Sequence, residues 1–301
     1  MSPMSKCLIT GLRSVELGVA NLPANEKFYT DVWGLAPVAH EGNAVYLRGT
    51  GSAHHIVALH PRARTELLSV TLSAASRADV DALAAQLKGN GVTISSAPAA
   101  IGEPGGGYGL SFRDPEGRTF RVIADDTRHA DATAAKDRPE RLAHVVLNST
   151  DVPNATRFFT DTIGFTLSDQ TKIMAFIRCN RDHHSLSFAV GTAATLNHIA
   201  FHMPHLEAVM LGAGRMKDAG YPIEWGVGRH GPGNNVFTYF VAPGDVVIEY
   251  TAEVEQVGDD YPARGPEYWT WPPGRIDHWG ISAPPSERMK DAQSRVRFAA
   301  T

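Results

Sequence analysis

The pattern of apolar and polar positions along the chain occurs twice. Residues 14–35 read SVELGVANLPANEKFYTDVWGL, and residues 144–165 read HVVLNSTDVPNATRFFTDTIGF. At an offset of 130 without a gap, the residues shared by the two stretches include Pro23 and Pro153, Phe28 and Phe158, Thr30 and Thr160, Asp31 and Asp161, and Gly34 and Gly164. Repetition of this kind predicts a structural unit that is present in two copies.

Further matches extend the repeat over most of the chain. With the offset slipping to 129 and then 128, residues 183–188 match 54–59, 207–221 match 78–92, and 237–250 match 109–122. In each copy an alternating apolar run predicts a strand, and apolar residues at helical spacing, such as Phe158, Phe159 and Ile163, predict a helix after it. Short β-rich runs punctuated by Gly and Pro follow, and a second βαβββ-like round completes the copy.

These elements predict an α+β fold of two tandem modules, each built from paired βαβββ units. The first module is expected over residues 1–124 and the second over 141–252, joined by a polar linker at 125–140. The tail at 253–301 contains Trp269, Trp271, Pro273 and Trp279 and has no counterpart in the first module. We expect the tail to pack on the second module, with a lid as the less favoured alternative.

Composition excludes several classes of protein. A chain of 301 residues with 43% hydrophobic content can bury two modest cores, and its formal charge of −4 offers no basic field for nucleic acid. No run approaches the roughly 20 apolar residues that span a bilayer. Cys7 and Cys179 are the only cysteines, and the first residues lack an export signal. We therefore expect a cytoplasmic protein without nucleic-acid or membrane partners.

The repeat also serves as an internal control, because matched positions that differ are candidates for function. The second module carries two histidines and a glutamate where the first carries two serines and an arginine: His144, His198 and Glu249 match Ser14, Ser69 and Arg121. Two imidazoles and a carboxylate form the 2-His-1-carboxylate ligand set, which leaves open positions and suits Fe(II), with Mn(II) as an alternative. A single strand histidine is more often a half-buried structural residue, but three coordinated replacements favour a metal site. An arginine would repel a cation, so the first module is expected to be metal-free.

At these residues the sequence resembles the two-module type I extradiol ring-cleaving dioxygenases of the vicinal oxygen chelate superfamily. The resemblance covers nearly the whole chain and is carried by LAHVVL (142–147), RDHHSLSF (181–188), LNHIAFHM (196–203) and GRHGPGNNVFTYFVAPGDVVIEYT (228–251). It implies that each module is a curved, partly open barrel and that His144, His198 and Glu249 bind a single Fe(II). It further implies meta cleavage of a substituted catechol by O2 to a muconic semialdehyde-type product, in a protein that forms a homo-oligomer.

By the same resemblance, His184, His230 and Tyr239 line the open coordination face. A catechol that binds a metal through two oxygens must lose at least one proton, which Tyr239 and His230 can accept. His184 is suited to stabilise the charge that O2 acquires and to deliver a proton.

Other candidates receive structural interpretations. The histidine pair recurs as His54 and His55 in the first module, so we assign His183 to structure. His202 lies four residues after His198 and, in a strand, on the same face, which suggests a ligand. No carboxylate accompanies the pair at the spacing of helical zinc proteases, so we expect a packing or supporting role instead. His205 and His278 have no supporting context, and Cys179 is expected to be a buried thiol rather than a nucleophile.

The turn Gly231-Pro232-Gly233 departs from the usual family pattern. Gly and Pro fix the backbone and remove side chains, so we expect this turn to leave room beside the substrate. The corresponding hypothesis is that the enzyme tolerates substituents at ring carbon 3 or 4.

Two other functions stay open. The first is a keto-acid dioxygenase of the hydroxyphenylpyruvate type, which also keeps its metal in the second of two modules. The second is a non-oxidative metal-binding relative, such as a glyoxalase-like protein. Glyoxalase-like sites usually draw ligands from two modules, which the residues Ser14, Ser69 and Arg121 contradict.

Overall fold

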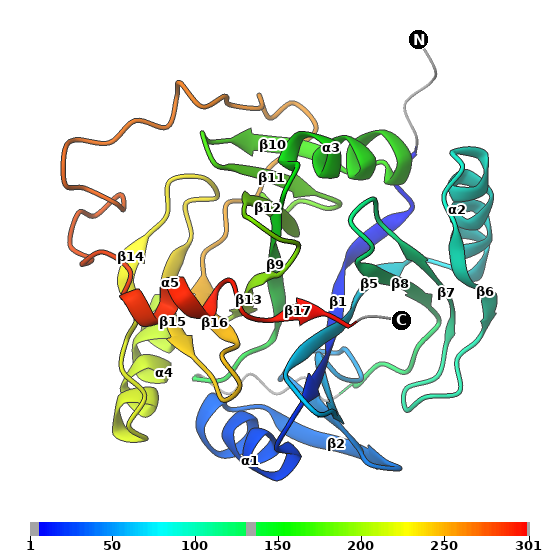
Figure 1. Cartoon of the computed structure of the whole chain (residues 1–301), viewed down its shortest axis with the longest axis horizontal. Helices are drawn as coiled ribbons and strands as arrows, with labels where there is room; N and C mark the ends of the chain where they lie inside the picture. The colour runs from blue at the N-terminus through cyan, green and yellow to red at the C-terminus, as the bar shows by residue number, and fades with distance from the viewer. Residues whose placement is uncertain (1–5, 131–136, 300–301) are drawn as a thin grey trace.

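Two sheets with the same strand order form the protein (Figure 1). A computed structural model describes residues 6–130 and 137–299. The first sheet runs β2-β3-β4-β1-β5-β8-β7-β6, and the second runs β10-β11-β12-β9-β13-β16-β15-β14. Each strand of the first sheet has its counterpart eight strands later, β1 in β9 and β2 in β10, and the counterparts follow the same order in the second sheet. This confirms the tandem α+β repeat.

The elements of the two modules correspond one to one. The first contains β1 (Ile9–Val19), α1 (Leu22–Lys27), η1 (Phe28–Trp33), β2 (Ala36–Glu41), β3 (Ala44–Arg48), β4 (Val57–Pro61), β5 (Glu66–Ala74), α2 (Arg77–Gly89), β6 (Ile94–Ala100), β7 (Tyr108–Arg113) and β8 (Thr119–Ala124). The second contains β9 (Arg141–Ser149), α3 (Val152–Arg157), η2 (Phe158–Ile163), β10 (Thr166–Gln170), β11 (Met174–Arg178), β12 (Leu186–Val190), β13 (Leu196–His202), α4 (Leu206–Asp218), β14 (Trp225–Arg229), β15 (Val236–Val241) and β16 (Val247–Ala252). The tail adds α5 (Glu287–Ala292) and β17 (Arg297–Phe298).

Residues at matching positions of the two copies begin and end the first helix of each module. The side chain of Asn21 accepts a hydrogen bond from the backbone N–H of Ala24, and Asp151 caps the second copy in the same way. Each helix continues as a π-helical turn, η1 or η2, a wider winding than the sequence pattern predicts. Gly34 ends the first turn at φ 99° and Gly164 the second at φ 93°, a left-handed conformation that glycine adopts without strain.

Each of these first helices packs on the other module. Trp33 of η1 is fully buried and stacks on Tyr250 of β16, with ring centroids 3.6 Å apart. In the opposite direction, Phe159 of η2 meets Phe120 of β8 edge to face at 4.9 Å. The modules are therefore interlocked rather than placed side by side.

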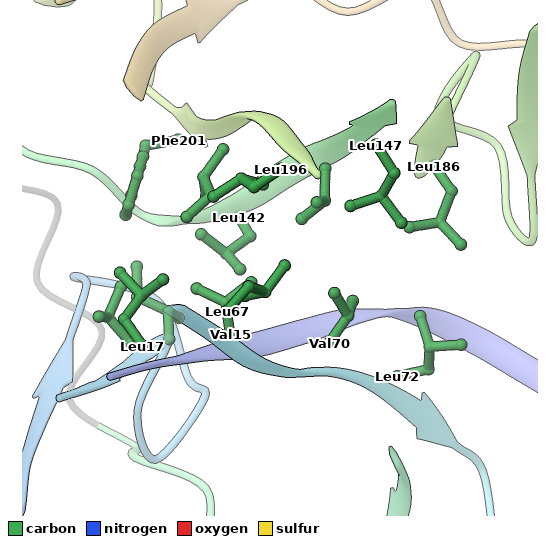
Figure 2. Close-up of a cluster of buried hydrophobic side chains, with 14 of the residues drawn as sticks. Val15, Leu17, Leu67, Val70, Leu72, Leu142, Leu147, Leu186, Leu196 and Phe201 are labelled. Carbon is green, nitrogen blue, oxygen red and sulfur yellow. The ribbon is translucent and has the colours of Figure 1, made fainter. Parts of the chain in front are cut away.

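A single apolar core also crosses the boundary between the modules. Val15 and Val70, from β1 and β5, face Leu142 and Leu196, from β9 and β13 (Figure 2). Because side chains alternate along a strand, the other face of the same strands is left for polar residues. In the second sheet that other face carries the candidate site.

The tail contacts more of the molecule than the sequence predicts. Met289 of α5 packs with Phe237 and Tyr239 of the second module. The last strand, β17, instead pairs in parallel with β5 of the first module, where Phe298 lies opposite Leu67. The tail therefore contacts the second module and also pairs with the first, and two residues of backbone pairing are too short to leave a periodic signal in the sequence.

The predicted linker is described only at its ends, because residues 131–136 lie outside the described residues. Near its start, Asp126 forms a buried ion pair with Arg13 at 3.0 Å. Among the residues that the structure describes, none of the helices combines the length and apolar character that crossing a bilayer requires.

Candidate active site

Three neighbouring strands at the centre of the second sheet bring His144, His198 and Glu249 together. In the strand registers Ala200 lies opposite both His144 and Glu249, and His198 precedes Ala200 by two residues. The pleat therefore places all three side chains on one face of the sheet. Their exposed fractions are at most 6%, so the cluster is buried.

The three candidate ligand atoms form a nearly regular triangle. His144 Nε2 lies 3.1 Å from Glu249 Oε2 and 3.4 Å from His198 Nε2, and the third side measures 3.3 Å. Ligand atoms about 2.1 Å from one ion and at right angles to each other lie about 3.0 Å apart. The residues present thus fit one metal ion bound through a face of three ligands.

Contacts outside the triangle prepare these atoms for a cation. Nδ1–H of His198 is within 2.8 Å of Asn197 Oδ1, which can only accept, so Nε2 of His198 carries the lone pair. Asn235 donates from Nδ2 to Oε1 of Glu249 at 3.4 Å, which leaves Oε2 for the metal. No described residue hydrogen-bonds Nδ1 of His144.

The electrostatics of the cluster favour a charged Glu249 and a neutral His198. Burial raises the pKa of Glu249, but the two neighbouring imidazoles more than offset this effect and hold the pKa below its usual range. Burial lowers the pKa of His198, although Glu249 opposes the shift. Neutral imidazole and ionised carboxylate are the forms that bind metal.

His230 and Tyr239 lie beside the triangle. Tyr239 is opposite Glu249 in the strand register, and its hydroxyl is 2.9 Å from Nε2 of His230. Burial raises the pKa of Tyr239, and the Glu249 charge adds to the shift; burial lowers the pKa of His230 to about 4. The His230 side chain is 21% exposed, so the site reaches solvent beside it.

His184 completes the cluster from the segment before β12. Its ring centroid lies 4.3 Å from that of His144, and burial, followed by the nearby His144, His183, His230 and His198, lowers its pKa. The structure therefore brings together all six residues that the sequence singled out for metal binding and catalysis: His144, His184, His198, His230, Tyr239 and Glu249.

The first module fills the matching positions with guanidinium groups. Arg121 forms ion pairs with Glu16 and with Glu103, and Ser14 accepts a hydrogen bond from Arg13 at 3.0 Å. Two cations, the buried Arg13 and the partly buried Arg121, thus lie in the region that matches the three ligands of the second module.

The remaining histidines and the cysteine lie outside the triangle. His202 contacts Glu140 through Nδ1 at 3.1 Å, and Nδ1 of His205 accepts from the Ala208 backbone to cap α4. His278 is exposed over the loop before β15, where Nδ1 is 3.3 Å from Asn234 Oδ1. Burial raises the pKa of the Cys179 thiol to about 12, which makes it a poor nucleophile.

The expectation about Gly231-Pro232-Gly233 is wrong. A Cβ on Gly231 would meet Cζ2 of Trp271 at 2.5 Å, and a Cβ on Gly233 would meet Cε1 of His184 at 2.9 Å. The glycines therefore make room for the tail and for His184 rather than for a substrate substituent. A short-range sequence pattern does not reveal which distant side chain fills such a space.

Asn197 and Asn235 escaped the sequence analysis although each supports a ligand. Their counterparts at offsets 129 and 128 are Leu68 and Gly107, which can make neither bond. Extending the comparison of the modules beyond histidine and glutamate would have revealed both.

Comparisons with known proteins agree with this geometry. A family model described as the Glyoxalase/Bleomycin resistance protein/Dioxygenase superfamily matches residues 11–122 and 141–250. Metapyrocatechase 2 of Cupriavidus necator is 30% identical over 200 residues, which cover 63% of this chain and 54% of that protein, so the chain spans about half of its length. The manganese-dependent 2,3-dihydroxybiphenyl 1,2-dioxygenase of Geobacillus genomosp. 3 is 25% identical over 260 residues, covering 76% of this chain and 80% of that protein.

Solved structures show the same fold. The Mn(II)-bound glyoxalase from Novosphingobium aromaticivorans is 38% identical with a TM-score of 0.87, and the match covers 93% of each chain. Homoprotocatechuate 2,3-dioxygenase from Arthrobacter globiformis has a TM-score of 0.86 at 22% identity, over 99% of this chain and 96% of that one. These relatives confirm the resemblance to the type I extradiol dioxygenases and the presence of two tandem modules.

Proposed function

Because the chain belongs to the Glyoxalase/Bleomycin resistance protein/Dioxygenase superfamily, we propose that it is an extradiol dioxygenase, which uses O2 to cleave the ring of a substituted catechol at a single metal ion. The carrying observation is the triangle of His144 Nε2, His198 Nε2 and Glu249 Oε2 beside the hydrogen-bonded pair of His230 and Tyr239. All of these residues belong to the second module.

The side chains around the triangle supply the proton chemistry. A bound divalent metal supplies positive charge and open positions at which two catechol oxygens and O2 can meet. The Tyr239 hydroxyl and Nε2 of His230 share one hydrogen bond, so this pair can take a proton from a catechol hydroxyl. His184, on the His144 side, is placed to stabilise negative charge and return a proton. Burial of Tyr239 and His184 keeps bulk water from these steps.

We assign Fe(II) as the working metal, with Mn(II) as the alternative. Two imidazoles and one carboxylate suit both ions. The name of the Geobacillus relative specifies manganese, and the Novosphingobium structure holds Mn(II). Loading the metal-free protein anaerobically with each ion, followed by turnover under O2, separates the two possibilities.

The proposed product is a ring-opened muconic semialdehyde-type compound. The test uses a panel of catechols, unsubstituted and substituted at ring carbon 3 or 4, with O2 uptake and visible absorbance followed together. Turnover of substituted catechols supports the proposal and its substrate class, whereas turnover confined to unsubstituted catechol contradicts the substrate class. Absence of turnover with metal bound contradicts the activity.

One observation favours a second candidate. The Novosphingobium structure that resembles this chain at 38% identity is described as a glyoxalase, which points to a non-oxidative metal enzyme. Against it, all three candidate ligands come from one module. Such an enzyme would consume no O2 with any substrate, so oxygen uptake separates the two candidates.

The expected cytoplasmic location and homo-oligomeric state stay predictions. Light scattering on the purified full chain checks the oligomeric state.

A further inference from the structure

Asp169 of β10 is a fully buried carboxylate without a role in the chemistry above. Its Oδ2 accepts hydrogen bonds from Nε2 of His183 at 2.8 Å and from the Tyr261 hydroxyl at 3.2 Å. Its Oδ1 accepts from the backbone N–H of Arg264 at 2.9 Å. Burying an ionised carboxylate costs free energy unless donors surround it. A buried carboxylate that is provided with three donors therefore calls for a specific role.

The carboxylate connects to the candidate active site through His183. Nδ1 of His183 lies 3.1 Å from Nδ1 of His184, and both rings are buried. Asp169, His183 and His184 thus form one continuous row of hydrogen bonds that ends at the ring beside His144.

The first module shows that the histidine pair does not need the carboxylate. His54 and His55 form the same contact between their Nδ1 atoms, at 3.0 Å. In the strand registers Ala39 lies opposite Tyr46 as Asp169 lies opposite Phe176, at the common offset of 130. The acid is therefore present only in the module that gathers the six site residues.

Hydrogen-bond chemistry then determines which nitrogens carry hydrogen. A carboxylate only accepts, so Nε2 of His183 is the donor to Asp169 and Nδ1 of a neutral His183 is an acceptor. Nδ1 of His184 must then donate to His183, which leaves Nε2 of His184 without hydrogen. The carboxylate of a catalytic triad fixes the tautomer of its histidine in the same way.

We propose that Asp169 is a positioning residue that acts through His183 to hold His184 in the tautomer whose Nε2 is free of hydrogen and available to the reactants. This inference rests on the proposed function: Nε2 of His184 takes up the proton of the second catechol hydroxyl, and the resulting N–H then stabilises negative charge and returns that proton.

The C-terminal tail takes part in this arrangement. Tyr261 meets the His183 ring edge to face at 5.6 Å, and Arg264 pairs with β10 through its backbone. These contacts exclude solvent from Asp169. Because the local dielectric is low where water is excluded, the hydrogen bonds from Asp169 to His184 are stronger there.

A nuclear magnetic resonance experiment tests the tautomer without any turnover. Metal-free protein labelled with 15N-histidine is measured at about pH 8, above the ordinary histidine pKa of about 6.5. The His184 signals are assigned with H184F. We expect hydrogen on Nδ1 of His184 in the native chain and loss of that preference in D169L, which removes the acceptor at similar volume. Hydrogen on Nε2 in the native chain, or the same tautomer in D169L, overturns the proposal.

Kinetics on the metal-loaded protein provide a second readout, with H54F as the matched control for H183F. We expect D169L and H183F to keep bound metal and catechol KM while kcat falls by about 10- to 100-fold, as when a general acid–base group is misplaced. H54F should keep the native kcat. Equal kcat in H183F and H54F, or a fall in bound metal parallel to kcat, contradicts a positioning role. If the native chain turns over no catechol, the proposed function fails. The tautomer measurement then still tests whether Asp169 determines which nitrogen of His184 carries hydrogen.

Discussion

At the scale of single residues, the two modules differ in how they compensate buried charge. Glu249 is fully buried beside the imidazoles of His144 and His198, whereas Glu16 in the first module is paired with Arg121 and His60. A buried carboxylate next to a guanidinium is a complete ion pair, but a carboxylate next to two lone pairs lacks a cation. The second arrangement is the one that a metal ion completes.

Replacing one of the candidate ligands should abolish metal binding. We expect H144S and E249Q to lose bound metal together with activity, since loss of one ligand from a set of three removes most of the affinity. Elemental analysis after anaerobic loading measures the metal content. The control S14A changes the matching position in the first module and should keep the native content. Full metal content in both H144S and E249Q would overturn the ligand assignment.

Glu16 should make the first module sensitive to acid. Burial raises the pKa of Glu16, but the contacts with His60 and Arg121 lower it by a larger amount, to about 2. A lowered pKa in the folded state means that the contribution to stability is complete above the unfolded value of 4.5 and is lost as pH falls toward 2. We expect the stability difference between the native chain and E16Q to shrink by up to about 3 kcal/mol over that interval. Urea unfolding of the metal-free proteins at several pH values measures it, and a difference independent of pH would contradict the assignment.

At the scale of helices and strands, the first helix of each module supports the other module. Trp33 stacks on Tyr250, which is the neighbour of Glu249 on β16, and the Tyr250 hydroxyl donates to the Trp33 carbonyl. The first module thereby fixes the strand that carries a candidate ligand of the second.

Removing this support should weaken both stability and metal binding. We expect W33A to lower the free energy of unfolding by about 3–5 kcal/mol, because a large buried aromatic side chain leaves a cavity. Metal affinity should fall as well, since β16 loses its packing partner. Unfolding curves and metal titration measure the two effects, with W33F as a conservative variant that loses less. An unfolding free energy equal to that of the native chain would show that this contact does not support β16.

The two tandem modules and the residues of the candidate site were predictable from the sequence, but the exchanged helices were not. The apolar spacing at Phe158, Phe159 and Ile163 predicts which face of a helix is buried but not which module covers it. Asp169 gave no signal of its own, because one acid in a short strand fits a solvent-facing position equally well. Only the match to Ala39 and the fold itself reveal that it is buried.

At the scale of the whole molecule, the modules and the tail form a single unit around the candidate site. The apolar core continues from one sheet to the other, and β17 returns the tail to the first module. The tail also brings Trp271 against Gly231, where the sequence predicted open space. Trp271 therefore forms a wall against Gly231, the residue that follows His230.

Substitution of this wall should change the choice of substrate. We expect W271A to raise kcat/KM for catechols with bulky substituents relative to unsubstituted catechol, because truncation opens the space against Gly231. The control Y268A removes an aromatic side chain that is 58% exposed in the same tail and should leave the ratio unchanged. An unchanged ratio in W271A would exclude the tail from substrate selection.

The most direct test of the central claim compares oxygen consumption with product formation in one preparation of known metal content. Protein loaded anaerobically with Fe(II) is mixed with its best catechol, O2 is admitted, and oxygen uptake and the absorbance of ring-opened product are recorded together. The extradiol assignment predicts equal amounts of O2 consumed and product formed, and neither in H144S. Bound metal at full stoichiometry without oxygen uptake on any catechol would contradict it and favour a keto-acid or non-oxidative enzyme.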